Sequence, residues 1–301
     1  MEIMEGSSGG FIRRHWRTAL WLLLGAAVPA QAYEAKIHQQ LTFVAAKQFN
    51  QCAEEVGLLP LTPLQVRYVA RASVSQVEGR WFRNWMHWSY YDRAGQSEKG
   101  LLWLIDTRFH RHFNDVVQTL ASSHSLADRY SNLGRLTSYL QDVTSPAHVV
   151  PVFYSRWWRL SMSDRFDLFP VDSDEVEQAL GDDCRDHLGR QAVSPAQLLR
   201  DAASETLRAV QRNIPGMRAS WQAFWRLAED PGAFGEYGVA GNSFGRRTEF
   251  KCPGQRCVLL DNDPLYRSFA TARHVEAVRA TLRAMAWSQA QDQDAIQVSS
   301  R

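Results

Sequence analysis

The sequence predicts a single large all-α domain with one small hairpin. Apolar residues recur at three- and four-residue spacing along most of the chain, which is the pattern of amphipathic helices. Helix-start signals accompany this pattern, because Thr62 and Ser194 each precede a proline that can occupy the first helical position. Strand-like alternation is scarce and is confined to residues 246–261.

The expected elements follow from this pattern in chain order. We expect helices over 34–56, 62–79, 97–121, 126–143, 194–214 and 270–290. No internal repeat interrupts them, and the balance of 45% hydrophobic and 22% charged residues is that of an ordinary globular protein. We therefore expect one helical domain over 33–290, followed by a disordered tail over 291–301.

Residues 1–32 have the order of a secretory signal peptide. Arginines at positions 13, 14 and 17 precede an apolar run over 18–28, and small residues follow up to Ala32. That run has about half the length that a membrane span needs, which makes an uncleaved anchor the less favoured alternative. We therefore expect a periplasmic or secreted protein with no transmembrane span after processing and with Tyr33 as its amino terminus.

Export changes how the four cysteines are interpreted, because disulfides persist in oxidising compartments. Cys252 and Cys257 enclose Pro-Gly-Gln-Arg, whose turn can close a disulfide-linked hairpin, and this leaves Cys52 to pair with Cys184. A zinc knuckle built on Cys252 and Cys257 is the alternative, but the chain has no second pair with that spacing.

Four side chains are candidates for a metal site built on helices. His38 lies on the first helix, His87 in a polar-aromatic segment, Asp142 near the end of a helix, and His148 just after Pro146. The plainer interpretation is a packed or surface histidine in each case, and an ordinary helix end for Asp142. A carboxylate there opposes the helix dipole at a cost of about 0.3–1 kcal/mol, which a bound cation would offset.

Three stretches resemble one family. "SYLQDVTSPAHVVPV" (138–152) resembles the His-x3-Asp-x5-His signature of the zinc-dependent phospholipase C and single-strand nuclease superfamily, with Asp142 and His148 in place. "AYEAKIH" resembles the family's aromatic amino terminus followed by a histidine, and "NWMHWSYYD" resembles its segment of a histidine, aromatics and an aspartate. The three stretches fall in the family's order.

The resemblance implies a mostly helical fold that holds three zinc ions and cleaves phosphodiesters. Tyr33 would offer its α-amine and backbone carbonyl, His38 its imidazole and Asp142 a bridging carboxylate to one ion. His87 and Asp142 would serve a second ion and the reaction itself. His148, with Asp167 further along the chain, would serve a third.

The sequence departs from the family at three ligand positions. Ser138 occupies the place of the first signature histidine, Val77 replaces a carboxylate, and Ser163 replaces the histidine that partners Asp167. Glu78 is the one substitute available beside Val77. Because zinc sites normally use at least three protein ligands, we expect one to three zinc ions, with the Tyr33 position alone retaining its full donor set.

The resulting functional prediction is an exported metal-dependent phosphodiesterase of the phospholipase C kind, acting on phospholipid headgroups. Its alternatives are a catalytically inactive relative that binds lipid or a partner in the same cleft, and a single-strand nuclease. The aromatics over 81–91 suit a lipid or a nucleic acid, or can simply pack in a core. A net charge of +2 gives no strong nucleic-acid signal.

Overall fold

The computed structural model describes residues 33–78, 90–91, 93, 109–123, 125–150, 152, 164–181, 183–188, 193–231 and 233–299, without the side chains of 76–78 and 294–299. Within these residues the chain is mostly helical and carries two antiparallel two-stranded sheets. The all-α prediction is therefore confirmed as a fold class. The predicted signal peptide over 1–32 and His87 lie outside the described residues.

Among the described residues, the helical elements include part or all of each helix that the sequence predicted, and they add the short helices α7 to α9 and the 3-10 helices η2 and η3. Their bounds are α2 (Ala35–Cys52), η1 (Glu54–Val56), α3 (Pro63–Glu78), α5 (Phe109–Ala121), α6 (Leu126–Asp142), α7 (Pro146–Val149), η2 (Phe166–Leu168), α8 (Ser173–Leu180), α9 (Cys184–Leu188), α10 (Pro195–Gln211), η3 (Trp221–Ala223) and α11 (Pro264–Ser299). The first part of the helix expected over 97–121 lies outside the described residues, up to position 108.

Helix starts use the caps that the sequence signalled. The Thr62 hydroxyl accepts a hydrogen bond from the backbone N–H of Gln65 at 3.4 Å, and the Gln65 side chain accepts from the Thr62 N–H at 2.7 Å, which is a capping box. Ser194 accepts from the Gln197 N–H at 3.3 Å, with Pro195 as the first helical residue. These bonds satisfy backbone donors that the first turn leaves free.

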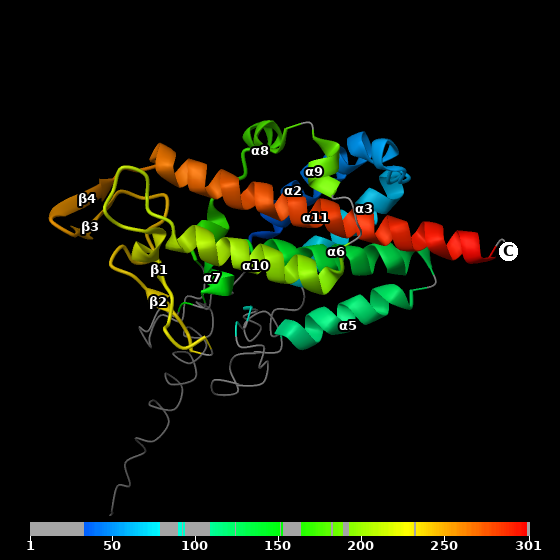
Figure 1. Cartoon of the computed structure of the whole chain (residues 1–301), viewed down its shortest axis with the longest axis horizontal. Helices are drawn as coiled ribbons and strands as arrows, with labels where there is room; N and C mark the ends of the chain where they lie inside the picture. Colours follow the sequence, from blue (N-terminus) through cyan, green and yellow to red (C-terminus); the bar gives the residue numbers. More distant parts are fainter. Residues whose placement is uncertain are drawn as a thin grey trace, which may run out of the picture.

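Helix α6 is the centre of the bundle, and it contacts α2, α3, α5, α10 and α11 (Figure 1). Gly134 allows the close approach of α3 to α6, because a Cβ at this position would lie 2.3 Å from the Val69 carbonyl oxygen and 2.8 Å from Ala72 Cβ. Leu133, Leu136 and Leu140 on α6 are fully buried. Asp142, the last residue of α6, is therefore carried by a helix with neighbours on several sides.

Helix α11 lies beside α10 and continues to Ser299, where the sequence led us to expect a disordered tail from residue 291 (Figure 1). That expectation is wrong. Neither glycine nor a second proline follows Pro264 to stop the helix, and Asp292 forms an ion pair with Arg129 at 2.8 Å. Gln293 donates to the Gly57 carbonyl at 3.3 Å, so the last turns with described side chains are held against the bundle.

The two sheets lie at one end of the molecule, near the start of α11 (Figure 1). Strands β1 (Trp225–Arg226) and β2 (Glu236–Tyr237) form one, and β3 (Thr248–Cys252) and β4 (Gln255–Leu259) form the other, which confirms the predicted hairpin. Aromatic rings fasten this end to α11: Trp221 and Phe269 have centroids 4.3 Å apart, and Phe244 and Tyr266 4.7 Å.

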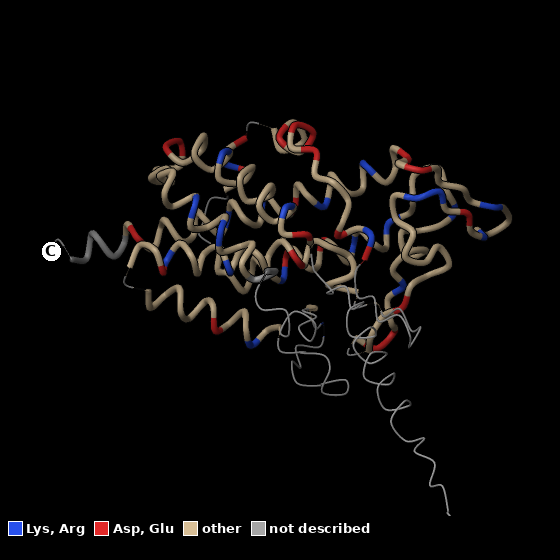
Figure 2. Tube along the Cα trace, turned by 180° about the vertical axis from the view of Figure 1, so that it is seen from behind, with Lys and Arg blue, Asp and Glu red and all other residues tan. Residues whose placement is uncertain are grey.

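Both predicted disulfides are present. Cys52 at the end of α2 is bonded to Cys184 at the start of α9, and Cys252 is bonded to Cys257 across β3 and β4, so the zinc knuckle is excluded. Among the described helices none combines the length and apolarity needed to cross a membrane. Basic and acidic positions are interspersed along the trace, as Figure 2 shows, in keeping with the small net charge.

Candidate metal centre

The centre of the candidate site is a buried pair formed by His38 on α2 and Asp142 on α6. His38 is fully buried and Asp142 is 5% exposed, so Asp142 does not point into solvent. His38 Nε2 lies 3.2 Å from Asp142 Oδ1. A positive charge beside this carboxylate would offset its unfavourable position at the carboxyl end of α6, where the helix dipole favours cations.

The two facing atoms of this pair are close but not aligned for a hydrogen bond. His38 Nε2 and Asp142 Oδ1 are both buried, and neither has a hydrogen-bond partner among the described residues. The short distance indicates an electrostatic contact, whereas the orientation leaves both atoms unsatisfied, and buried polar atoms are rarely left so. Imidazole nitrogen and carboxylate oxygen are both zinc ligands, so the donor types of this pair fit a cation.

Tyr33 lies directly against this pair. Its ring meets the His38 ring edge-on with centroids 5.8 Å apart, and it is fully buried. The Tyr33 hydroxyl is 3.4 Å from Thr144 Oγ1, and burial raises the pKa of the phenol well above its ordinary value. The phenol is therefore neutral at physiological pH.

A second imidazole–carboxylate pair lies on the segment that follows. His148 Nε2 is 3.6 Å from Asp167 Oδ2, and both residues are 1% exposed. The interpretation of His148 as a surface histidine is wrong, because Pro146 starts the short helix α7 and turns His148 into the interior. The sequence predicted both residues as ligands of the same metal position, and the fold brings them together.

Ser145 connects the two pairs. Its backbone N–H donates to the Asp142 carbonyl at 2.9 Å, and its hydroxyl donates to Asp167 Oδ1 at 2.6 Å. The Glu34 N–H donates to the Asp167 carbonyl at 3.3 Å, which places the residues beside Tyr33 against η2. The segments carrying Tyr33, Asp142 and Asp167 therefore meet at one place in the fold.

Two of the predicted ligands cannot be placed, because His87 and the side chain of Glu78 lie outside the described residues. Ser163, which replaces a family histidine, lies outside them too. Ser138 is 2% exposed and lies one turn before Asp142 on α6. In the part of the chain that is described, no group of three or more His, Cys, Asp or Glu side chains is placed to hold a metal ion.

Two residues near the site were not predicted from the sequence. Gln141 on α6 contacts His38 Nδ1, and Asp164 lies two residues before η2. Asp164 Oδ2 accepts from Trp225 Nε1 at 2.9 Å and from the Tyr237 hydroxyl at 2.7 Å. Burial, with the nearby charge of Asp167, raises the pKa of Asp164 to about 6. No spacing rule would have found either residue, because their partners lie far away in the sequence.

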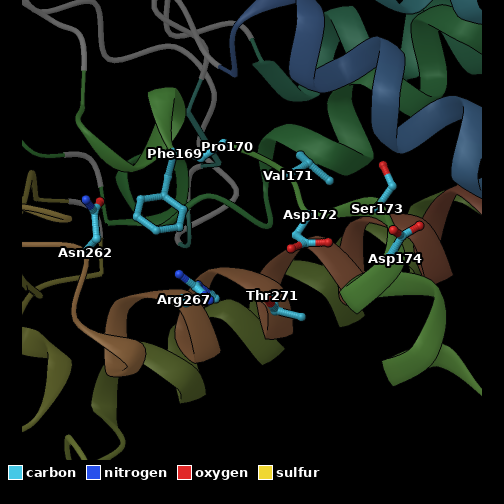
Figure 3. Close-up of a pocket in the computed structure, with 9 residues that line it drawn as sticks. All are labelled: Phe169, Pro170, Val171, Asp172, Ser173, Asp174, Asn262, Arg267 and Thr271. Atoms are coloured by element: carbon cyan, nitrogen blue, oxygen red, sulfur yellow. The ribbon is translucent and has the colours of Figure 1, made fainter.

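The pocket drawn in Figure 3 is separate from this site. It has a volume of about 530 Å³ and lies between the start of α8 and the first turns of α11, where Arg267 and Thr271 face Phe169 and Asp172. It begins two residues after Asp167, but no predicted metal ligand lines it. Its mixture of acidic, basic and apolar side chains selects no particular ligand.

Comparisons with known proteins give no relative for this chain. No protein-family model matches it, no curated protein matches it, and no solved structure matches it. The interpretation of the site therefore rests on its own residues and geometry.

Proposed function

We propose that the chain is an exported metal-dependent phosphodiesterase of the phospholipase C kind, which binds fewer zinc ions than the family it resembles. The observation that carries the proposal is the buried pair His38 Nε2 and Asp142 Oδ1, 3.2 Å apart and unsatisfied. Tyr33 beside this pair supports a third donor, since processing after Ala32 would expose its α-amine. The two disulfides agree with an oxidising compartment.

In this proposal His38, Asp142 and the amino terminus hold one zinc ion, and His148 with Asp167 offer a second, weaker position. Bound zinc would polarise a phosphoryl oxygen and lower the pKa of a water molecule. The protein's own part is to orient the ligands: Ser145 fixes the Asp167 carboxylate through a 2.6 Å hydrogen bond. Burial of both pairs strengthens every charge interaction among these groups.

The second candidate is a catalytically inactive relative that keeps the buried pair and binds lipid or a partner. It is favoured by the fact that no described group of three side-chain ligands converges. A phospholipid substrate is preferred to a single-stranded nucleic acid, because basic and acidic residues are interspersed and form no basic stripe on the described trace.

The deciding experiment is the metal content of the processed protein, which begins at Tyr33, by elemental analysis. We expect at least one zinc ion per chain, and Asp142→Ala should remove it together with any hydrolysis of a short-chain phospholipid. Ser138→His should raise the stoichiometry. Asp292→Ala is the matched control, because it removes a partly buried carboxylate near the C-terminal end of α11, where it pairs with Arg129.

The outcomes separate the candidates. Zinc without hydrolysis of phospholipid or single-stranded DNA would favour the inactive relative. Hydrolysis of DNA alone would replace phospholipase by nuclease. A processed wild-type protein that binds no zinc would end the metal interpretation.

A further inference from the structure

Gln141 is the hub of a buried hydrogen-bond network around His38. The side chain is fully buried on α6, next to Asp142. Its Oε1 lies 2.6 Å from His38 Nδ1, and its Nε2 lies 3.1 Å from the hydroxyl oxygens of Thr42 and Thr281. Three helices, α2, α6 and α11, thus meet at this one amide.

The direction of each hydrogen bond in the network is determined by its outer members. Thr281 donates its hydroxyl hydrogen to the Ala277 carbonyl at 2.8 Å. Thr42 donates to Ser73 Oγ at 3.3 Å, and Ser73 in turn donates to the Ala70 carbonyl at 2.9 Å. Each hydroxyl has a single hydrogen, so both threonine oxygens must accept from Gln141. The amide nitrogen of Gln141 therefore faces the threonines, and its oxygen faces His38.

This orientation decides which ring nitrogen of His38 carries the hydrogen. An amide oxygen can only accept, so His38 Nδ1 must be the donor in the 2.6 Å contact. In the neutral ring Nε2 is then left with a lone pair, which faces Asp142 Oδ1 at 3.2 Å. Two acceptors that face each other repel, unless a proton or a metal cation lies between them.

We propose that Gln141 is the positioning residue of the metal site: by accepting from His38 Nδ1 it keeps His38 Nε2 free of hydrogen and directed, together with Asp142, at a cation. This rests on the proposed function for the identity of the cation. Metal-binding histidines generally donate their other N–H to an acceptor that fixes the ring, and the loss of that acceptor typically costs 10–100-fold in metal affinity. Here the acceptor is itself fixed by two threonines from other helices.

The first test needs no metal and no substitution. In metal-free protein with ¹⁵N-labelled histidine, long-range proton–nitrogen correlation spectra assign the hydrogen of each neutral ring. We expect His38 to carry its hydrogen on Nδ1 at a pH where the ring is neutral. A hydrogen on Nε2 would overturn the inference.

The second test removes the acceptor. In Gln141→Leu the Nδ1 hydrogen loses its partner while Nε2 still faces a carboxylate, so the hydrogen should move to Nε2, and zinc affinity measured by titration should fall 10–100-fold. Gln141→Glu keeps an acceptor and should keep the hydrogen on Nδ1. The control Gln289→Leu removes another buried glutamine, which contacts Tyr130, and should change neither property.

Failure of this inference can be told from failure of the proposed function. Zinc binding that survives Gln141→Leu at full affinity, with the His38 hydrogen unmoved, refutes the role of Gln141 and leaves the metal site standing. A protein that binds no zinc but carries the hydrogen on Nδ1 refutes the metal site, while the assignment of the His38 ring by Gln141 stands.

Discussion

His274 gives the structure a specific sensitivity to acid. This residue of α11 is 1% exposed, its Nε2 has no hydrogen-bond partner among the described residues, and its ring packs against Tyr33 and Phe166 with centroids 5.8 and 6.0 Å away. Burial, with a smaller effect of the neighbouring Arg273 charge, lowers the pKa of His274 from 6.5 to about 3. The folded protein therefore keeps this ring neutral where the unfolded chain protonates it.

The sign and size of the effect follow from proton linkage. Between pH 3 and 6.5 the unfolded chain binds more protons at His274 than the folded chain does, so stability falls as the pH falls through this window. The full difference between the pKa values of His274 in the unfolded and folded states corresponds to roughly 5 kcal/mol, because one pKa unit is worth about 1.4 kcal/mol. At neutral pH His274 contributes almost nothing to this dependence, since the ring is neutral in both states.

The assay is urea unfolding at a series of pH values for the wild type and for His274→Phe, which keeps an aromatic ring against Tyr33 and Phe166. As the pH falls from neutral towards 3, the free energy of unfolding of the wild type should decrease by several kcal/mol more than that of the variant. The control variant is His112→Phe on α5, which replaces a partly exposed histidine in place of the buried one. Wild-type and His274→Phe curves that stay parallel over the whole range would refute the reasoning.

Two further predictions concern the covalent frame and the amino terminus. Replacing both Cys52 and Cys184 by serine should lower the free energy of unfolding by about 5 kcal/mol, whereas the same change at Cys252 and Cys257 should lower it by about 2 kcal/mol. The difference arises because the loop-closure entropy grows with loop length. Equal losses in denaturant titrations would contradict this. One extra residue before Tyr33 should weaken zinc binding in calorimetric titrations, because the α-amine becomes an amide, and unchanged affinity would exclude that donor.

The sequence was sufficient for the elements with strong local signals. Long amphipathic helices with Ser or Thr caps, such as the one that starts after Ser194, were found from periodicity, and both disulfides were predicted from an even cysteine count and the expectation of export. The short helices α7 to α9 and the strands β1 and β2 were missed, because two to eight residues carry too little pattern. Their formation depends on packing against the rest of the fold: α8 and α9 pack mainly against α11, α7 packs against α10, and β1 packs against η3.

The candidate site could be predicted only in part. Five of the proposed donors lie among the described residues, and the fold buries all five: Tyr33, His38, Asp142, His148 and Asp167. The role of Gln141 was out of reach, because its partners on α2 and α11 lie 99 to 140 residues away in the chain. A glutamine inside an amphipathic helix looks like a surface residue until the helices that surround it are placed.

The disulfide between Cys52 and Cys184 also shortens the covalent distance between the two halves of the site. Along the backbone 129 residues separate His38 from Asp167, whereas the path through the disulfide uses 14 residues to Cys52 and 17 from Cys184. A path about four times shorter lowers the entropy cost of bringing these two segments together by about 1 kcal/mol. In the oxidised chain the segments that carry His38 and Asp167 are thus already tethered to each other before the site forms. Oxidation should therefore speed the assembly of the site as well as stabilise it.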